Sequence, residues 1–434
     1  MTHTTKCLLV LLFTYSTSFA QFKNIKLDEY ASTNKKSEPG ITINRKNPNN
    51  IIAAATSNNI YYTLDGGGTW QTVKGTSPGS PDNNVAVISD DKGNIYSFHV
   101  SATGDGEKAA DQILCHLSND GGKTWSPGSP FGVDSKNQFK PGATVDSKGN
   151  VWVAWTQFDK LGSEDESCQS NILLTSSSNG KKWSKPIQIS QTAGDCRDDD
   201  NSAEGAMPAI GVDGKAFLTW GNQNKIFLDR SFSGGSLWLT NDIGVGQQHG
   251  GWNMKVPGYD RCSGMPVLLI NQSKGPAQGT LYLVWADQKN GENDTDVWFV
   301  RSTNFGDNWT SPMKLGDDKN KRHQFSPRMA VDQTTGYIYV VYFDRDNYED
   351  NQTDVILSYS TDSGSSFKSV KISETPFAAE GATISGTLTD ISAHRGIIAP
   401  VWTRVDGSQA SIWSSVIKQA DLIQAPQISS KKKK

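Results

Sequence analysis

The chain has 434 residues, 35% of them hydrophobic, and a net charge of −3. The near balance of acids and bases excludes a basic face for nucleic acid, and the mean hydropathy of −0.52 argues for a protein that lives in water. A chain of this length needs more than one ordinary core unless the core is repetitive. The 41 Gly and 13 Trp residues are typical of many short strands joined by tight turns.

The first twenty residues have the pattern of a secretory leader. Lys6 stands before the apolar run CLLVLLF, and the small-residue sequence SFA ends at Ala20. The apolar run is shorter than the ~18 residues of a membrane-spanning segment. We therefore expect cleavage after Ala20, no transmembrane segment, and a secreted, periplasmic or cell-surface protein. One domain should cover residues 21–420, followed by a solvated tail over 421–434.

An eight-residue box recurs along the chain. TLDGGGTW (63–70), SNDGGKTW (118–125) and STDSGSSF (360–367) share Ser or Thr, Asp, Gly and an aromatic residue at the same places, whereas SSSNGKKW (176–183), SFSGGSLW (231–238) and STNFGDNW (302–309) replace the Asp. Ser/Thr and Asp suit an Asx-type turn, Gly suits a backbone angle that other residues resist, and the aromatic ring should pack between sheets. The complete boxes predict these structural residues: Asp65, Trp70, Asp120, Trp125, Asp362 and Phe367.

The spacing of the boxes predicts the fold. Successive boxes start 55, 58, 55, 71 and 58 residues apart, and each unit holds four short alternating segments, such as NVWVAW and KPIQIS, that predict the four antiparallel strands of a propeller blade. The last unit lacks its fourth strand. FKNIKL (22–27) resembles FKSVKI (367–372), so residues 22–28 should pair beside 409–417. We expect an all-β propeller of seven blades, with six blades and an irregular end as the alternative.

These boxes are identified as the Asp-box repeats of the sialidase-like superfamily. Stretches such as TAGDCRDDDNSAEGA and GWNMKVPGYDRCSGMPV are similar to secreted bacterial propellers labelled exo-α-sialidase or BNR-repeat glycosyl hydrolase. The resemblance implies a glycoside hydrolase that acts on anionic glycans. Residues 38–44, EPGITIN, carry no arginine where sialidases have Arg-Ile-Pro. A non-catalytic propeller that binds a glycan or protein at the cell surface, and a polysaccharide lyase, therefore stay as alternatives.

Strand order places the boxes and the candidate site on opposite faces. The boxes join third and fourth strands, whereas the loops between second and third strands, and those between blades, lie on the other face. Arg197, Arg261 and Arg328 precede or begin the first strands of three successive blades, so their guanidinium groups could converge on one carboxylate. The alternative is that each arginine pairs with a nearby Asp, as Arg197 could with Asp198.

Further candidates share that face. Glu204 and Glu380 each stand in the sequence AEGA at a blade entrance, where they could serve as the general acid and base of a glycosidase. Ion pairs at the rim are the alternative. His249, Trp252 and His323 are predicted as proton-transfer or sugar-stacking groups.

Two acidic loops, 287–297 and 344–355, suggest a metal. Carboxylate oxygens suit calcium, so Asp344 and Asp354 form a candidate structural calcium site, with capping of the loops as the alternative. The acidic run 198–200 could serve likewise. The sequence requires no other cofactor. We expect a monomer whose partner is a carbohydrate or a cell-surface glycoprotein.

An exported chain can form disulfides. Cys115 lies in an apparent strand and is expected to be a buried free thiol. Cys196 and Cys262 both fall in loops that enter blades on the same face, which makes them the preferred pair. Cys168, from a loop within a blade, is the rival partner.

Overall fold

A computed structural model describes residues 22–30, 38–55, 59–74, 85–103, 110–132, 135–380, 385–425 and 427. The expected leader over residues 1–20 lies outside these ranges and stays a prediction. In the part of the chain that is described, no helix is long and apolar enough to cross a membrane.

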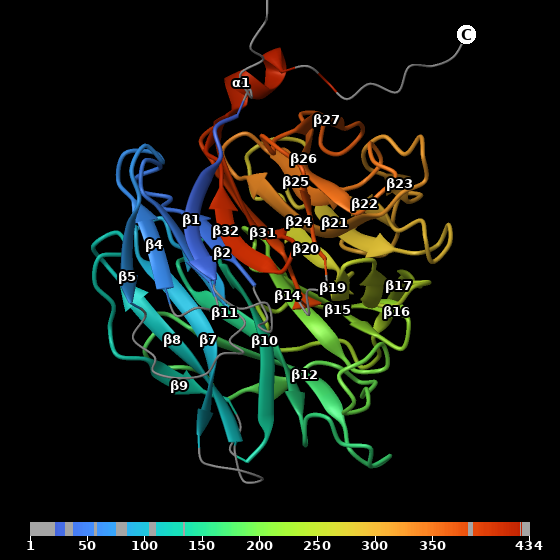
Figure 1. The fold of residues 1–434 in the computed structure, drawn as a ribbon. Helices are drawn as coiled ribbons and strands as arrows, with labels where there is room; N and C mark the ends of the chain where they lie inside the picture. Colours follow the sequence, from blue (N-terminus) through green and yellow to red (C-terminus); the bar gives the residue numbers. More distant parts are fainter. Residues whose placement is uncertain are drawn as a thin grey trace, which may run out of the picture.

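The described strands form seven four-stranded antiparallel blades around an axis (Figure 1). The first three blades are β2 (Gly40–Ile43), β3 (Ile51–Ala55), β4 (Asn59–Thr63) and β5 (Gln71–Lys74); β6 (Ala86–Ser89), β7 (Ile95–Thr103), β8 (Ala110–Ser118) and β9 (Ser129–Phe131); and β10 (Asn137–Val145), β11 (Val151–Phe158), β12 (Ser170–Ser177) and β13 (Ile187–Gln188). The next three are β14 (Glu204–Ile210), β15 (Ala216–Asn222), β16 (Lys225–Ser231) and β17 (Ile243–Gln247); β20 (Val267–Ile270), β21 (Leu281–Asp287), β22 (Asp296–Ser302) and β23 (Met313–Lys314); and β24 (Gln324–Asp332), β25 (Tyr337–Asp344), β26 (Gln352–Ser360) and β27 (Lys368–Lys371), with β28 (Phe377–Ala378) beside β26.

The seventh blade joins the two ends of the chain. It consists of β30 (Thr389–His394), β31 (Ile397–Asp406), β32 (Gln409–Ser414) and β1 (Ile25–Tyr30), with β33 (Ile417–Lys418) beside β31. β1 runs antiparallel to β32, so that Ile25 faces Ser414 and Tyr30 faces Ala410. The first strand of every blade contacts the first strands of its two neighbours, and β30 contacts β2. The seven-bladed ring and its closure by the N-terminal strand are therefore confirmed.

The boxes occupy the predicted turns between third and fourth strands. In the first box Thr63 Oγ1 donates to Asp65, and Asp65 accepts the backbone N–H of Thr69 at 2.9 Å. The degenerate box at 176–183 differs from the predicted alignment by one residue. There Asn179, not Ser178, takes the place of the Asp and accepts the N–H of Lys182 at 3.0 Å.

The core lies between the blades. Trp125 of the second blade packs against a cluster shared by the first and second blades, and Phe367 packs in the same way between the fifth and sixth. Every residue of β15 and β21 is buried, because each blade is covered on both faces by its neighbours. The predicted tail begins too early, since Leu422 of α1 (Gln419–Gln424) lies fully inside the core.

A small sheet outside the blades was not predicted. β18 (Asn253–Val256) and β19 (Tyr259–Ser263) form a hairpin between the fourth and fifth blades, and β19 pairs in parallel with β29 (Ser385–Gly386). The hairpin thereby links a segment between the fourth and fifth blades to one between the sixth and seventh. We call residues 252–263 the inserted hairpin.

Candidate functional site

The axis of the propeller contains a cavity of about 260 Å³ that is lined by the first strands of the blades. Its charged lining residues are Glu38, Arg45, Lys140, Arg328 and Asp390. The end opposite the boxes is formed by segments that enter the blades, which is where sequence reasoning placed the site. We call this end the axis mouth.

Three of the first strands begin with a β-bulge near the axis mouth. The register shifts fall between Phe139 and Gly142 in β10, between Glu204 and Met207 in β14, and between Phe325 and Arg328 in β24. Inside these bulges Lys140, Gly205 and Ser326 have positive φ angles of 49°, 77° and 56°. Such a conformation costs a non-glycine residue about 1–3 kcal/mol, so the surrounding contacts hold Lys140 in place. Bulges often redirect a side chain toward a functional site.

Lys140 lies between two glutamates. Its Nζ is 4.0 Å from Glu38 Oε1 and 3.9 Å from Glu204 Oε2, and it lies 5.4 Å from the centre of the Trp252 ring. The Glu204 side chain is fully buried. Burial lowers the pKa of the Lys140 ammonium, against the opposing charges of Glu38 and Glu204. A buried lysine of this kind can exchange a proton closer to neutral pH than a surface lysine can.

Asp198 connects this group to the inserted hairpin. Arg261 of β19 donates two hydrogen bonds of 2.8 Å to the Asp198 carboxylate, and its guanidinium lies 4.4 Å from the centre of the Trp252 ring. Both partners are mostly buried, with 18% and 20% of their side chains exposed. This paired, planar geometry holds Asp198 in its ionised form.

The Asp198 and Glu204 carboxyl groups have pKa values that move apart. Burial acts to raise the pKa of Asp198, but the hydrogen bonds from Arg261 outweigh it and bring the pKa down to about 2. Burial, then the neighbouring Asp198 charge, raises the pKa of Glu204 well above its usual value. Among the described residues neither Glu204 oxygen accepts a hydrogen bond, and the Lys140 ammonium lies 3.9 Å from Oε2. A protonated Glu204 that donates to Asp198 fits this arrangement, and such a split is how carboxyl pairs divide acid and base roles.

The three predicted arginines do not gather around one point. Arg197 is 45% exposed and pairs with Glu164 at 3.0 Å, and Arg261 is bound by Asp198. Of the three, Arg328 alone lines the axial cavity. The alternative, in which each arginine pairs with a nearby Asp, is confirmed for Arg261, whereas Arg197 pairs with Glu164 and not with Asp198.

The other predicted site residues are dispersed. Glu380 is exposed. His249 is half exposed beside Asp287, with Nδ1 3.5 Å from the carboxylate. His323 is buried against the Thr295 hydroxyl, and burial lowers its pKa to about 4. Trp252 is buried under Arg261, so it positions the arginine and offers no open face to a sugar.

Asp344 and Asp354 have protein partners, as the capping alternative expects, and the calcium site stays a prediction. Asp354 binds Lys371 at 2.8 Å and the Tyr348 hydroxyl at 3.0 Å, and Asp344 accepts the N–H of Asp346. In the described ranges, three carboxylates elsewhere lie close enough together to share an ion: Asp294, Asp296 and Asp318. The ammonium of Lys314 pairs with two of them, so a lysine already supplies the positive charge there.

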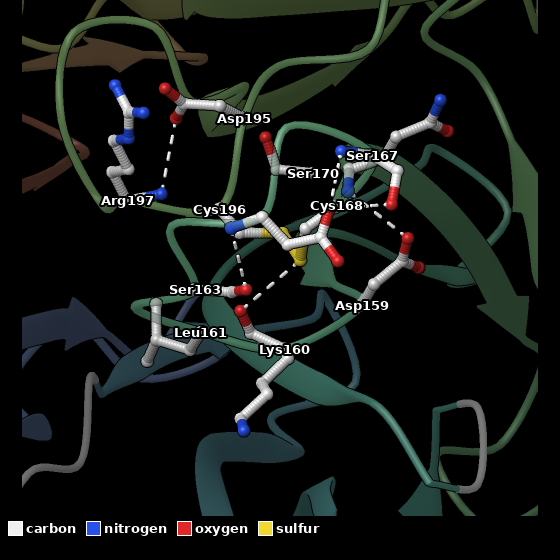
Figure 2. Close-up of a disulfide and its surroundings, with 12 residues drawn as sticks. Asp159, Lys160, Leu161, Ser163, Ser167, Cys168, Ser170, Asp195, Cys196 and Arg197 are labelled. Atoms are coloured by element: carbon white, nitrogen blue, oxygen red, sulfur yellow. Dashed lines mark hydrogen bonds between the residues drawn. A yellow bond between two sulfur atoms is a disulfide. The ribbon is translucent and has the colours of Figure 1, made fainter.

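The disulfide joins Cys168 and Cys196, with a Cα separation of 5.7 Å, and not Cys196 and Cys262 (Figure 2). Cys262 is a buried free thiol. Cys115 is also a buried free thiol, as predicted. Cys168 lies in the loop between β11 and β12, and Cys196 lies in the loop that leads into β14. The disulfide joins these two neighbouring loops. Cys262 instead lies in β19 of the inserted hairpin, in a segment between two blades that the sequence analysis treated as a loop.

Sequence reasoning missed Lys140 and Glu38 and gave Asp198 a different role. A signal was present: FKPG (139–142) and FSPR (325–328) match at the start of two first strands, and both are the bulges described above. Glu38 lies in EPGITIN, at the entrance of the first blade, where the resemblance to sialidases directed attention to a missing arginine.

No protein-family model matches the chain, and no curated protein matches it. Solved structures share its fold. A mutant α-L-arabinofuranosidase of Fusarium graminearum in complex with an iminosugar inhibitor is 11% identical, with 93% of this chain and 99% of that chain covered and a TM-score of 0.51. An α-L-arabinofuranosidase of the same fungus with arabinobiose is 10% identical, with the same coverage and a TM-score of 0.50. A Trypanosoma rangeli sialidase is 11% identical over 94% of this chain and 60% of its own, with a TM-score of 0.49. At these identities the likeness establishes the propeller fold alone.

Proposed function

We propose that the protein is a glycoside hydrolase that binds its glycan at the axis mouth. One observation carries the proposal: the fully buried Glu204, whose pKa burial and the Asp198 charge raise well above its usual value, lies 3.9 Å from Lys140, a residue that lines the axial cavity. A carboxylic acid that stays protonated near neutral pH is what a glycosidase needs to protonate a leaving oxygen. The two arabinofuranosidases of the same fold are consistent with this activity.

Glu38 is the second carboxylate in this proposal. Glu38 and Glu204 flank Lys140, and the two oxygens nearest its Nζ lie at most about 8 Å apart, which admits the spacing of a glycosidase pair. Asp198 has a different part in this proposal, because its charge helps to raise the pKa of Glu204. Lys140 lines the cavity and its Nζ lies 3.9 Å from Glu204, so in this proposal a ligand reaches Glu204 by displacing the lysine side chain.

The charges favour an uncharged glycan over the anionic one implied by the resemblance. At the axis mouth Lys140 is matched by Glu38, and Arg261 is matched by Asp198. A sugar carboxylate bound by Lys140 or Arg261 would have to separate that residue from its acid, which costs energy in a buried site. The arabinobiose bound to one structure of the same fold is a neutral disaccharide.

Glycan binding without cleavage is the second candidate, and the complete burial of Glu204 favours it. The test incubates the purified chain with neutral oligosaccharides, including arabinobiose, and with sialylated and uronic-acid glycans, and separates the products by chromatography. We expect release of sugar from a neutral glycan and a loss of about 10²–10⁴-fold in Glu204→Gln. Binding without any product would establish the second candidate. Equal rates in Glu204→Gln and the parent would remove Glu204 from the reaction.

A further inference from the structure

The loop that carries Asp198 is held by an unusually dense set of contacts. Residues 194–203, which we call the Asp198 loop, are bound at both ends to Ser170: its backbone exchanges hydrogen bonds with Gly194, and its hydroxyl accepts the N–H of Ala203 at 2.9 Å. A side chain at Gly194 would approach the Ala203 nitrogen to 2.3 Å. The two ends of the loop are therefore closely packed, and the loop leads directly into Glu204.

The disulfide fixes the middle of the same loop. Cys196 is fully buried, its carbonyl accepts the N–H of Gly162 at 2.7 Å, and Cys168 anchors it to the loop that ends β11. Figure 2 shows Asp195 and Arg197 on one side of this bridge and Lys160 and Leu161 on the other. Asp198, two residues further on, has a φ of 60°, a conformation that persists only where the surroundings enforce it.

The disulfide also packs against the base of Lys140. Cys168 and Cys196 form one apolar cluster with Phe139 and Phe158, whose ring centres are 6.0 Å apart. Phe139 immediately precedes the bulge, and Lys140 lies 5.4 Å from its ring. A single covalent bond thus supports both the Asp198 loop and the bulge that carries Lys140.

We propose that the Cys168–Cys196 disulfide is a positioning element, which holds the Asp198 carboxylate against Glu204 and fixes Lys140 beside both. Its catalytic consequence rests on the function proposed above. Other parts of the ring, including the junction of β1 and β32, close without a disulfide among the described residues. The bond therefore lies where three titratable side chains meet, and not where the ring of blades is closed.

The test replaces both cysteines, as Cys168→Ala/Cys196→Ala, because alanine fits the apolar cluster. Without the bond Asp198 moves away from Glu204, so Glu204 loses the neighbouring charge that helps it keep its proton. We expect kcat to fall at least tenfold and the alkaline limb of the pH–rate profile to move to lower pH by about one unit. A bond that gives stability alone would lower Tm and leave that limb in place.

Two further measurements make the result decisive. Asp120→Ala, which weakens a distant box, is the matched control and should leave the limb unchanged. The carboxyl titration of Glu204, read by infrared difference against Glu204→Gln, should move to lower pH in the cysteine variant whether or not any glycan is cleaved. If the variant does not accumulate, the folded parent reduced with a phosphine replaces it. An unshifted Glu204 titration overturns this inference, whereas a shifted titration in a chain that cleaves no glycan overturns the proposed function alone.

Discussion

The Asp-box turns and the axis mouth both depend on carboxylates, but they are assembled in different ways. In the second box, Asp120 accepts hydrogen bonds from the N–H and hydroxyl of Thr124, four residues along the chain. At the axis mouth, Asp198 is held by Arg261, which is 63 residues away. A box is complete within eight residues, so one copy can change without the others. The axis mouth exists once, and each of its members depends on segments from several blades.

Removing residues 22–30 should have the largest effect, because this deletion attacks a long-range junction. It opens the pairing of β1 with β32 and takes Phe22 out of the core. Loss of a buried Phe alone costs about 3–5 kcal/mol, and the exposed edge of β32 adds a site for aggregation. We expect the free energy of unfolding, measured in urea, to fall by at least about 4 kcal/mol. Removal of residues 428–434 is the control. A deletion of 22–30 as stable as this control would show that the ring does not need its composite blade.

Arg261→Met should come next. Breaking a buried ion pair leaves one charge without its partner and costs about 3–5 kcal/mol, which the partial exposure of Arg261 and Asp198 reduces to about 2–3 kcal/mol. Arg197→Met is the matched control, since Arg197 and Glu164 are 45% and 82% exposed and such a pair contributes about 0–1 kcal/mol. The measurement is the urea midpoint of both variants. Similar losses of stability in the two variants would mean that the ion pair at the axis mouth contributes no more than the ion pair at the surface.

The pH dependence of stability should separate the two regions. Against the effect of burial, hydrogen bonds from Thr124 hold the pKa of Asp120 below its usual value, so the box stays ionised above pH 5. Glu204 behaves in the opposite sense because its folded pKa is raised. Its contribution is complete below the unfolded pKa of about 4.3 and is lost as the pH rises toward the folded pKa, at up to about 1.4 kcal/mol per pH unit.

Glu204→Gln should therefore remove part of the decline in stability between pH 5 and pH 8, whereas Asp120→Asn should leave the decline as it is. Urea unfolding at both pH values gives the comparison. If the parent and Glu204→Gln lose stability equally over this interval, Glu204 is ionised in the folded protein and the assigned proton donor is wrong.

The smallest effect is expected in a box. Asp120→Ala removes hydrogen bonds in a partly exposed turn and should cost about 1 kcal/mol. Asp120→Asn should cost less, because Asn304 accepts the equivalent N–H at 3.0 Å in the fifth blade. Thermal unfolding of the two variants tests the order. A loss of stability in Asp120→Ala as large as that in Arg261→Met would contradict the expectation that the local turns contribute less than the long-range contacts of the axis mouth.

Most of the fold could be predicted because its information is local. The boxes mark the turns, the alternating segments mark the strands, and the likeness of FKNIKL to FKSVKI identified the strand that completes the seventh blade. The inserted hairpin was missed, although the interval of 71 residues between the boxes at 231 and 302 recorded its extra length. The spacing of the boxes shows how many residues lie between them, but it does not show which of these residues form an insertion outside the blades.

The sequence could predict which face of the propeller carries the site, but not the contacts within it. Strand order put Glu204 and Arg261 on the correct side, but it could not say that Asp198 would take Arg261 as its partner or that Arg197 would turn outward to Glu164. The same limit explains the disulfide: several loops share that face, and sequence order does not rank their distances. Lys140 was missed because lysine in a strand is ordinarily a solvent-facing residue, and a bulge reverses that expectation.

The composite blade also determines how the molecule answers a pulling force. Ile25 and Ser414 face each other at one end of the β1–β32 pair, so the two ends of the chain leave from the same place. Tension applied through the termini, once β33 and α1 have detached, loads the hydrogen bonds between these strands one after another and not all at once. The β1–β32 pair therefore separates one hydrogen bond at a time, starting from the end where Ile25 faces Ser414.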